Sequence, residues 1–262
     1  MDNNKYLLEY YENYDEDGRL TTRFGHVEYL TTMKYIERYL TDNARILEIG
    51  AGTGRYSHAL ARKGYKVDAV ELIEHNIEIF KSKITPDERI TVRQGNAMEL
   101  SFIEDDTYDV TLLLGPMYHL YTEEDKLKAL SEAVRVTKRG GVIFVAYCMG
   151  DASILQYGFG RGVIHELMEK CLLDPETFDT FSNPWDIFEL HRKEDIDVLR
   201  EKLNVEQLHF VATDGYANHI REKLADMDDE TYNLFIKYHL ATCERLDLIG
   251  YSNHTLDIFK KK

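Results

Sequence analysis

Three alternating glycines stand out as residues that can shape a binding site. Gly50, Gly52 and Gly54 lie in EIGAGTG (48–54), directly after a short apolar run and before a helix-like segment. Without a Cβ, a glycine lets the backbone turn tightly and approach a ligand closely. The first turn of a helix offers free N–H groups, and an open parallel sheet binds ligands at the carboxyl ends of its strands. The loop therefore predicts a ligand-binding turn between a strand and a helix.

The main competing interpretation of this loop is a dinucleotide site. That fingerprint, G-x-G-x-x-G/A, needs a third small residue at the position that Arg55 occupies here. Glu48 would also direct a carboxylate toward the turn, which is unfavourable beside a pyrophosphate and favourable beside an ammonium or sulfonium group. Both residues favour a cationic ligand over a dinucleotide, and an oxidoreductase is kept only as an alternative.

Two polar positions follow the next apolar runs. Glu71 is the last residue of the strand expected at 66–71, within VDAVEL (67–72) and 17 residues after Gly54. An acid at this point can accept hydrogen bonds from both hydroxyls of a ribose. In GNAMEL (95–100), Asn96 is placed to bond an adenine edge and Ala97 to supply a backbone N–H. These residues favour a nucleoside-containing ligand, although a solvated acid is the alternative for Glu71.

The run LLLGPMYHL (112–120) carries the candidate catalytic residues. Gly115 and Pro116 break the strand, which places Tyr118 and His119 at the sheet edge where a substrate would lie. His119 is the candidate general base, because imidazole titrates near neutrality. A base helps only a nucleophile that is protonated at working pH, such as a phenol, thiol or ammonium. The alternative is that His119 only packs or bonds the backbone.

These residues need a parallel sheet to bring them together. Short apolar runs alternate with helical segments, and this rhythm predicts βαβ units in an α/β fold with helices on both faces of the sheet. Thr122 is the expected N-cap of one helix, and Gly140-Gly141 its expected stop. The expected strands span 45–49, 66–71, 89–93, 108–114, 142–147, 207–215 and 252–262, and the expected helices span 24–40, 54–63, 74–83, 123–137, 193–203, 217–226 and 229–248.

The EIGAGTG loop, Glu71, Asn96-Ala97 and the strand ending in GPMYHL together resemble the class I S-adenosylmethionine-dependent methyltransferases. VTKRGGVIFVA (136–146) is similar to that family's K-P-G-G turn, with Arg139 in place of proline. The resemblance implies a Rossmann-like sheet of seven strands, the last antiparallel and inserted beside strand five. It also implies S-adenosyl-L-methionine as cofactor and S-adenosyl-L-homocysteine as product. The cofactor contacts it implies are Glu48, Gly50, Ala51, Gly52, Gly54, Tyr56, Glu71, Leu72, Asn96, Ala97, Met98, Leu114 and Gly115.

The resemblance also organises the rest of the chain. Residues 1–262 are expected to form one methyltransferase domain, with a cofactor-binding core at 19–148. Helical insertions at 149–205 and 214–250 are expected either to form a lid over the substrate or only to pack against the rest of the domain. Tyr14 and Arg23 are expected to close over the cofactor and hold its carboxylate. Tyr118 is expected to contact the methionyl part of the cofactor, with a core position as the alternative.

Charge and composition narrow the acceptor. The 262 residues carry 32 Lys and Arg against 47 Asp and Glu, a net charge of −15, and no basic stripe that would bind phosphates. GPMY (115–118) also departs from the [D/N/S]-P-P-[Y/F] motif of nucleic-acid base methyltransferases. We expect transfer to a small molecule, neutral or cationic. An RNA-modifying methyltransferase and a cofactor-binding regulatory protein without turnover are the alternatives.

The remaining predictions concern metal, compartment and assembly. No His/Cys cluster has zinc spacing, so no metal site is predicted. Cys148, Cys171 and Cys243 contain no C-x-x-C pair, the N-terminal segment is acidic, and no apolar run is long enough to span a bilayer. These features predict a cytoplasmic protein that contacts no membrane. The sequence leaves a monomer and a homodimer equally open.

Overall fold

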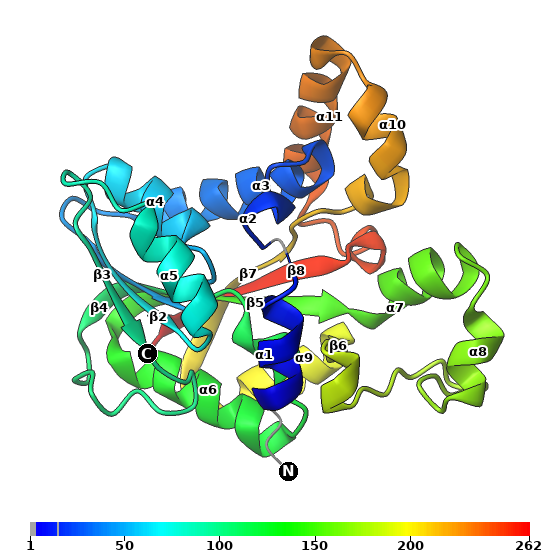
Figure 1. The fold of residues 1–262 in the computed structure, drawn as a ribbon, viewed down its shortest axis with the longest axis horizontal. Coiled ribbons are helices and arrows are strands. Elements are labelled where there is room, and N and C mark those ends of the chain that lie inside the picture. Colours follow the sequence, from blue (N-terminus) through cyan, green and yellow to red (C-terminus); the bar gives the residue numbers. More distant parts are fainter. Residues whose placement is uncertain (1–3, 15) are drawn as a thin grey trace.

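The computed structural model describes residues 4–14 and 16–262 and is built around one mostly parallel sheet (Figure 1). The strands run in the order β3-β2-β1-β4-β5-β8-β7, and short β6 pairs with the end of β5. β8 is antiparallel to both β5 and β7. The predicted α/β fold with an antiparallel final strand beside strand five is confirmed. The strands are β1 (Arg45–Ile49), β2 (Lys66–Glu71), β3 (Ile90–Gln94), β4 (Tyr108–Leu113), β5 (Thr137–Met149), β6 (Leu190–His191), β7 (Val205–Ala212) and β8 (His254–Lys261).

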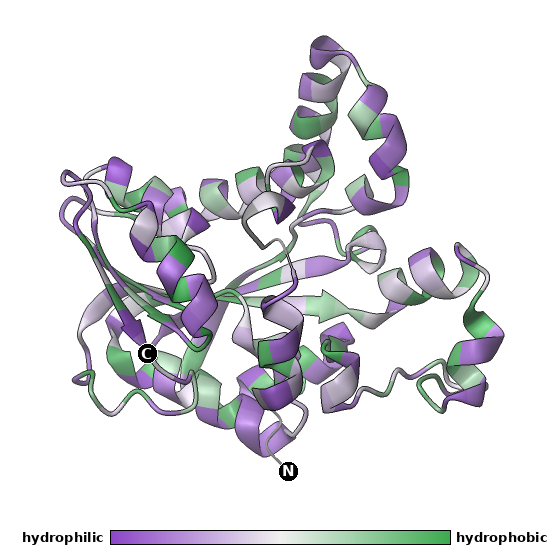
Figure 2. Ribbon diagram, in the orientation of Figure 1, coloured by the Kyte–Doolittle hydropathy of each residue, from purple (hydrophilic) through white to green (hydrophobic). Residues whose placement is uncertain are grey.

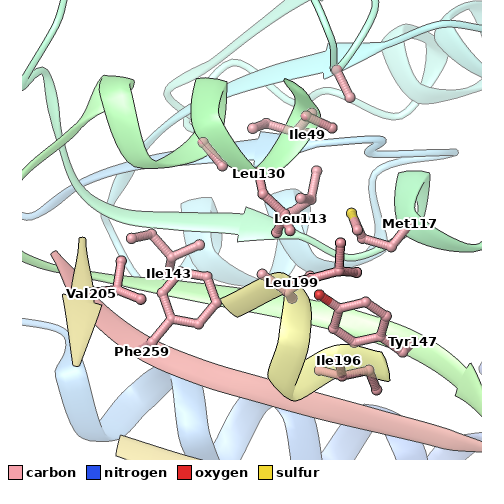
Figure 3. Close-up of a cluster of buried hydrophobic side chains, with 14 of the residues drawn as sticks. Ile49, Leu113, Met117, Leu130, Ile143, Tyr147, Ile196, Leu199, Val205 and Phe259 are labelled. Carbon is pink, nitrogen blue, oxygen red and sulfur yellow. The ribbon is translucent and has the colours of Figure 1, made fainter. Parts of the chain in front are cut away.

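Helices cover both faces of this sheet and bury separate cores. On one face, α6 and α9 pack Leu130, Ile196 and Leu199 against Ile49 and Phe259 of the strands (Figure 3). On the other face, α3 and α4 contribute to a second cluster. The central strands are apolar on both sides for this reason, whereas edge strand β3 is partly exposed. The helices are α3 (Arg23–Tyr39), α4 (Arg55–Arg62), α5 (Glu74–Ser82), α6 (Glu123–Val136) and α9 (Lys193–Glu201).

The junction between α6 and β5 differs from its prediction. Thr122 caps α6 as expected, because its side chain accepts from the Asp125 N–H. The helix ends at Val136, however, and β5 begins at Thr137, five residues before the predicted start at 142. Gly140, with a φ of +77°, therefore lies inside the strand, near the register shift between β4 and β5, and does not stop the helix.

Two helical arms extend from the same end of the sheet (Figure 1), and polar residues colour much of their length (Figure 2). One arm consists of α7, η2 and α8 and follows β5, and the other consists of η4, α10 and α11 and follows β7. N-terminal α1 and α2 lie near the space between them. No helix in residues 4–14 and 16–262 combines the length and apolarity needed to cross a membrane. These elements are α1 (Asn4–Tyr11), α2 (Glu16–Arg19), η1 (Pro116–His119), α7 (Gly150–Ser153), η2 (Ile154–Phe159), α8 (Ile164–Glu169), η3 (Pro184–Asp186), η4 (Ala217–Ile220), α10 (Arg221–Asp226), α11 (Asp229–Thr242) and η5 (Ile249–Tyr251).

Candidate active site

A cleft lies at the carboxyl ends of β1, β2, β3 and β4, where parallel strands deliver their following loops to one edge. Most of the residues predicted to touch a ligand line this cleft, although they come from the ends of four strands and the segments that follow them. They are Glu48, Gly50, Ala51, Gly52, Tyr56, Glu71, Leu72, Asn96, Ala97, Met98, Leu114, Gly115, Tyr118 and His119.

The glycine loop adopts a conformation that other residues rarely take. Gly50, Gly52 and Gly54 all have positive φ angles, of +73°, +54° and +85°. A Cβ on Gly50 would lie 2.5 Å from Cδ of Pro116, and a Cβ on Gly54 would collide with the Phe80 ring. Gly54 is absent from the cleft wall, so its glycine serves close packing at the start of α4. The prediction of a cofactor contact for Gly54 has no support in this placement.

Glu71 is fixed at the cleft by backbone donors. Its Oε2 accepts from the Gly52 N–H at 2.7 Å, and its Oε1 accepts from the Ile73 N–H at 2.9 Å. The side chain is buried, and burial raises the pKa of Glu71 although these hydrogen bonds oppose the shift. Each carboxylate oxygen can accept a further bond. Glu71 thus links the glycine loop to the end of β2 and presents acceptors to the cleft.

Glu48 is a second buried acid beside the same loop. Its Oε2 accepts from the Ser57 N–H at 2.9 Å and from the Ser57 hydroxyl. Burial raises the pKa of Glu48 to about 8, against these hydrogen bonds, and the nearby Glu71 charge adds to the rise. Glu48 is therefore largely protonated at neutral pH in the ligand-free protein.

Asn96 organises the turn after β3. Its side-chain oxygen accepts from the Met98 N–H at 2.9 Å, and its carbonyl accepts from the Glu99 N–H at 2.9 Å. These bonds bring Ala97 and Met98 to the cleft wall. The Asn96 oxygen is thus engaged within the turn.

His119 lies in the cleft but has the character of a held, neutral imidazole. Its Nδ1 lies 2.9 Å from the Ile187 carbonyl, which can only accept, so Nδ1 carries the proton. Nε2 then accepts from the Tyr11 hydroxyl at 3.0 Å. Burial lowers the pKa of His119 to about 4. This geometry favours the alternative of a packed, backbone-bonded histidine over a general base.

Tyr118 is held by its own loop. Its hydroxyl donates to the Leu114 carbonyl at 2.9 Å, and its ring meets that of His119 edge-on at 4.9 Å. The side chain is buried and contributes its ring to the cleft wall. The Tyr118 ring thus forms part of the cleft wall at this edge of the sheet.

The N-terminal segment supplies a different arginine from the predicted one. Arg23 donates to the Leu224 and Met227 carbonyls and pairs with Asp229, so the α10–α11 arm holds it and it is absent from the cleft wall. Arg19 lines the cleft instead. Arg23 begins α3, and that helix fixes the direction of its side chain. Arg19 ends α2, four residues earlier in the chain, and its side chain reaches the cleft.

Alanine substitutions of these two arginines are expected to differ. Arg19→Ala should weaken binding of S-adenosylhomocysteine about tenfold through loss of one charged hydrogen-bond donor. Arg23→Ala should leave the affinity unchanged, because its partners lie on the helical arm. Isothermal titration of both variants measures the difference, and equal losses would contradict the assignment to Arg19.

A second, larger cavity of about 1150 Å³ adjoins the cleft, between the two arms and the N-terminal helices. Tyr11, Arg19 and Tyr118 line both spaces, so they form the boundary between them. Tyr14, predicted to close over the cofactor, lines only this second cavity. Eight aromatic side chains contribute to its wall, and they are Tyr10, Tyr11, Tyr14, Phe24, Tyr118, Tyr157, Phe181 and Phe188.

Sequence reasoning missed Tyr11 and Arg19. The helical spacing of tyrosines in the N-terminal segment was the available signal for Tyr11, which packs with Tyr10 and Tyr14. No local pattern distinguished Arg19 from Arg23. Which of the two arginines reaches the cleft depends on how α2 and α3 pack.

Residues 46–141 match a family profile described as "Methyltransferase domain". The chain is similar to demethylmenaquinone methyltransferase of Clavibacter sepedonicus, with 36% identity over 38% of this chain and 40% of that protein. It is also similar to the S-adenosyl-L-methionine-dependent Diels-Alderase iccD of Talaromyces variabilis, with 29% identity over 39% of this chain and 35% of that protein. The chain spans about half the length of the curated relatives it matches.

A solved structure of a SAM-dependent methyltransferase from Methanosarcina mazei has a similar fold. The TM-score is 0.57 at 18% identity, over 87% of this chain and 96% of that one. At this identity the similarity concerns the fold alone.

Proposed function

This chain carries a class I S-adenosylmethionine-dependent methyltransferase domain, and we propose that it transfers the methyl group to a small molecule held in the larger cavity. The observation that carries the proposal is the shared boundary of Tyr11, Arg19 and Tyr118 between the cleft at the strand ends and a larger cavity with eight aromatic side chains in its wall. A methyl group passing between the two spaces would pass these side chains.

The cleft residues fit the proposed cofactor. Gly50 leaves no room for a side chain against Pro116, and the loop backbone is open to close approach. Glu71 offers a fixed carboxylate to a ribose, and Leu72, Ala97 and Met98 offer a largely apolar surface to an adenine. Arg19 is positioned to pair with a carboxylate. We assign these residues to cofactor binding.

The bound cofactor supplies a methyl group that its sulfonium already activates. The protein must then orient the acceptor and exclude water, for which effective molarities of about 10⁵ M or more are possible. Tyr118 and Tyr11 form the wall between donor and acceptor, and His119 holds Tyr11 in place through its Nε2. We assign Tyr118 and His119 to positioning, and the two helical arms to enclosing the acceptor.

Methyl transfer from labelled cofactor tests the proposal. Incubation of the protein with radiolabelled S-adenosylmethionine and a small-molecule extract is expected to label at least one low-mass compound. A boiled-protein control defines the background. Labelling confined to RNA would instead support the RNA-modifying alternative, which also predicts binding that falls steeply with salt.

A second candidate is a cofactor-binding protein whose cavity guides a reaction without methyl turnover. The relative from Talaromyces variabilis is named as a cofactor-dependent Diels-Alderase, which motivates this alternative. Cofactor binding with no label transferred to any extract component or RNA would favour it. The larger cavity is compatible with either activity.

The raised pKa of Glu48 predicts pH-dependent cofactor affinity. A nearby positive charge favours the ionised carboxylate, so binding should release a proton from Glu48, whose pKa is about 8 in the free protein. Affinity for S-adenosylmethionine should therefore rise about tenfold from pH 6.5 to 8.5. Calorimetry in two buffers of different ionisation enthalpy measures the released proton. Glu48→Gln should lose the pH dependence, and an unchanged slope in that variant would refute the assignment.

A further inference from the structure

Four charged side chains meet on the wall of the larger cavity. Glu28 of α3, Asp214 after β7 and His254 at the start of β8 bring their ligand atoms within 4.8 Å of one another. Arg19 donates to Glu28 at 2.8 Å. All four residues line the cavity, and Arg19 also lines the cofactor cleft. The group therefore extends from the boundary with the cleft into the acceptor space.

Asp214 orients the imidazole of His254. Its Oδ2 lies 2.9 Å from Nδ1, and its Oδ1 accepts from the Ser252 hydroxyl at 2.6 Å and the His254 N–H at 3.2 Å. Glu28 lies 3.5 Å from the same Nδ1. Nδ1 thus carries a proton between two carboxylates. Among the described residues, none forms a hydrogen bond with Nε2.

The neighbouring residue offers a second signal for a ligand here. Asn253 lines the same cavity, is 5% exposed, and its side-chain oxygen is buried with no hydrogen-bond partner among the described residues. An unpaired buried acceptor is costly, and a donor from a bound molecule would satisfy it. The pair His254 and Asn253 is therefore suited to a molecule that carries hydroxyl groups.

We propose that His254, oriented by Asp214, is the acid–base residue for the methyl acceptor, and that the acceptor is a planar aromatic molecule with an ionisable hydroxyl group. This inference rests on the methyl-transfer function proposed above. The aromatic wall of the cavity suits a planar ring. The charges also favour this role over a cation site, because Arg19 and a protonated His254 balance Glu28 and Asp214.

The charges around His254 decide which protonation state meets the acceptor. Burial lowers the pKa of His254, but Glu28, Cys148 and Asp214 together raise it well above its usual value of 6.5. The imidazolium is therefore favoured, and its Nε2–H can donate a charge-assisted hydrogen bond to an ionised hydroxyl. Arg19 is linked to the His254 imidazole through Glu28, to which it donates a hydrogen bond.

The acceptor oxygen becomes nucleophilic by one of two routes. A neutral His254 takes the acceptor's hydroxyl proton on Nε2, and an imidazolium binds an acceptor that has already lost its proton to water. In both cases the acceptor oxygen keeps its electron pair and forms the new O–C bond. The electrons of the breaking C–S bond return to sulfur, which becomes neutral. On the first route the proton taken up by Nε2 then leaves to solvent, and on the second route His254 keeps its proton.

Binding of 4-nitrophenol tests the site directly, because its phenolate is coloured. At pH 6, with S-adenosylhomocysteine present, the wild type should bind the phenolate form about tenfold or more tightly than His254→Asn. This variant can keep the hydrogen bond to Asp214 but loses the cavity-facing nitrogen. His219→Asn, which changes a half-buried histidine on η4 that does not line the cavity, should bind like the wild type. 4-Nitroanisole, which lacks the acidic proton, should not distinguish the three proteins.

Methylation of a panel of naphthols and dihydroxynaphthalenes gives the kinetic test. His254→Asn should lower kcat/KM for a hydroxylated acceptor about 100-fold and leave the KM for S-adenosylmethionine unchanged. Asp214→Asn should move the alkaline limb of phenolate binding to lower pH, because one carboxylate no longer supports the imidazolium. A purely structural role for Asp214 would not move this limb.

Several outcomes would overturn the inference. They are equal phenolate binding by His254→Asn, failure of the wild type to bind 4-nitrophenol or methylate any panel member, and activity that chelation removes and Mg²⁺ or Mn²⁺ restores. Binding of S-adenosylhomocysteine and methylation of extract, measured on the same proteins, test the proposed function separately.

Discussion

Replacing Glu71 with alanine is expected to weaken binding of S-adenosylhomocysteine by about 100-fold or more. Two hydrogen bonds to a buried, charged acceptor would be lost, each contributing about 1.5–3 kcal/mol. The substitution also removes the acceptor for the Gly52 N–H at 2.7 Å, so the glycine loop loses its link to β2. In thermal denaturation, the ligand-induced rise in melting temperature should almost disappear.

Two comparisons separate this effect from misfolding. Glu74→Ala removes an exposed acid three residues further along and should keep the full ligand-induced shift. Glu71→Gln preserves one acceptor oxygen, so its ligand-induced rise in melting temperature should lie between those of the wild type and Glu71→Ala. If Glu71→Ala melts like the wild type without ligand and still binds with unchanged affinity, the assignment of Glu71 to the ribose is wrong.

Replacing Gly50 with alanine is expected to impair both folding stability and cofactor binding. The new Cβ would lie 2.5 Å from Cδ of Pro116, and the residue would have to keep a φ of +73°. The strained backbone and the displaced proline together should lower the free energy of unfolding by about 1–3 kcal/mol. Because Pro116 precedes Tyr118, the displacement should also disturb the boundary between the two cavities.

Gly64→Ala is the matched control for Gly50→Ala. Gly64 has a φ of +94°, but a Cβ there would meet no atom of the described residues within 4 Å, and the residue lies outside the cleft wall. Gly64→Ala should lower the free energy of unfolding only by the cost of the left-handed backbone, and it should bind S-adenosylhomocysteine with the affinity of the wild type. Chemical denaturation and calorimetry measure the two effects. Equal behaviour of the two variants would contradict a role for close packing at Gly50.

The sheet could be predicted because its information is local. Each central strand is an apolar run between helices, and burial on both faces requires such a run. The predicted bounds of β1 and β2 agree with the structure. Short β6 was missed, because a two-residue strand carries no periodicity. The early start of β5 was missed because Gly140 can end a helix or interrupt a strand, and only pairing with β4 decides between them.

The cofactor cleft was largely predictable for a related reason. Glu48, Gly50, Glu71 and Asn96 each lie at or just beyond the carboxyl end of a strand, and parallel strands end at a common edge whatever the rest of the chain does. Chemical type and chain position therefore placed these residues together. His119 shows the limit of this reasoning, because burial lowers its pKa against the hydrogen bond to the Ile187 carbonyl, and neither can be read from its neighbours in sequence.

The sequence by itself thus determined the sheet, the glycine loop and the acids beside it. Only the tertiary structure decided that Arg19 and not Arg23 reaches the cleft, and that Glu28, Asp214 and His254 meet in the adjoining cavity. These three residues come from α3, the loop after β7 and the start of β8, and they are separated by up to 226 positions in the chain. Strand residues obey a repeating geometry, whereas contacts between distant helices and loops depend on how the whole chain packs.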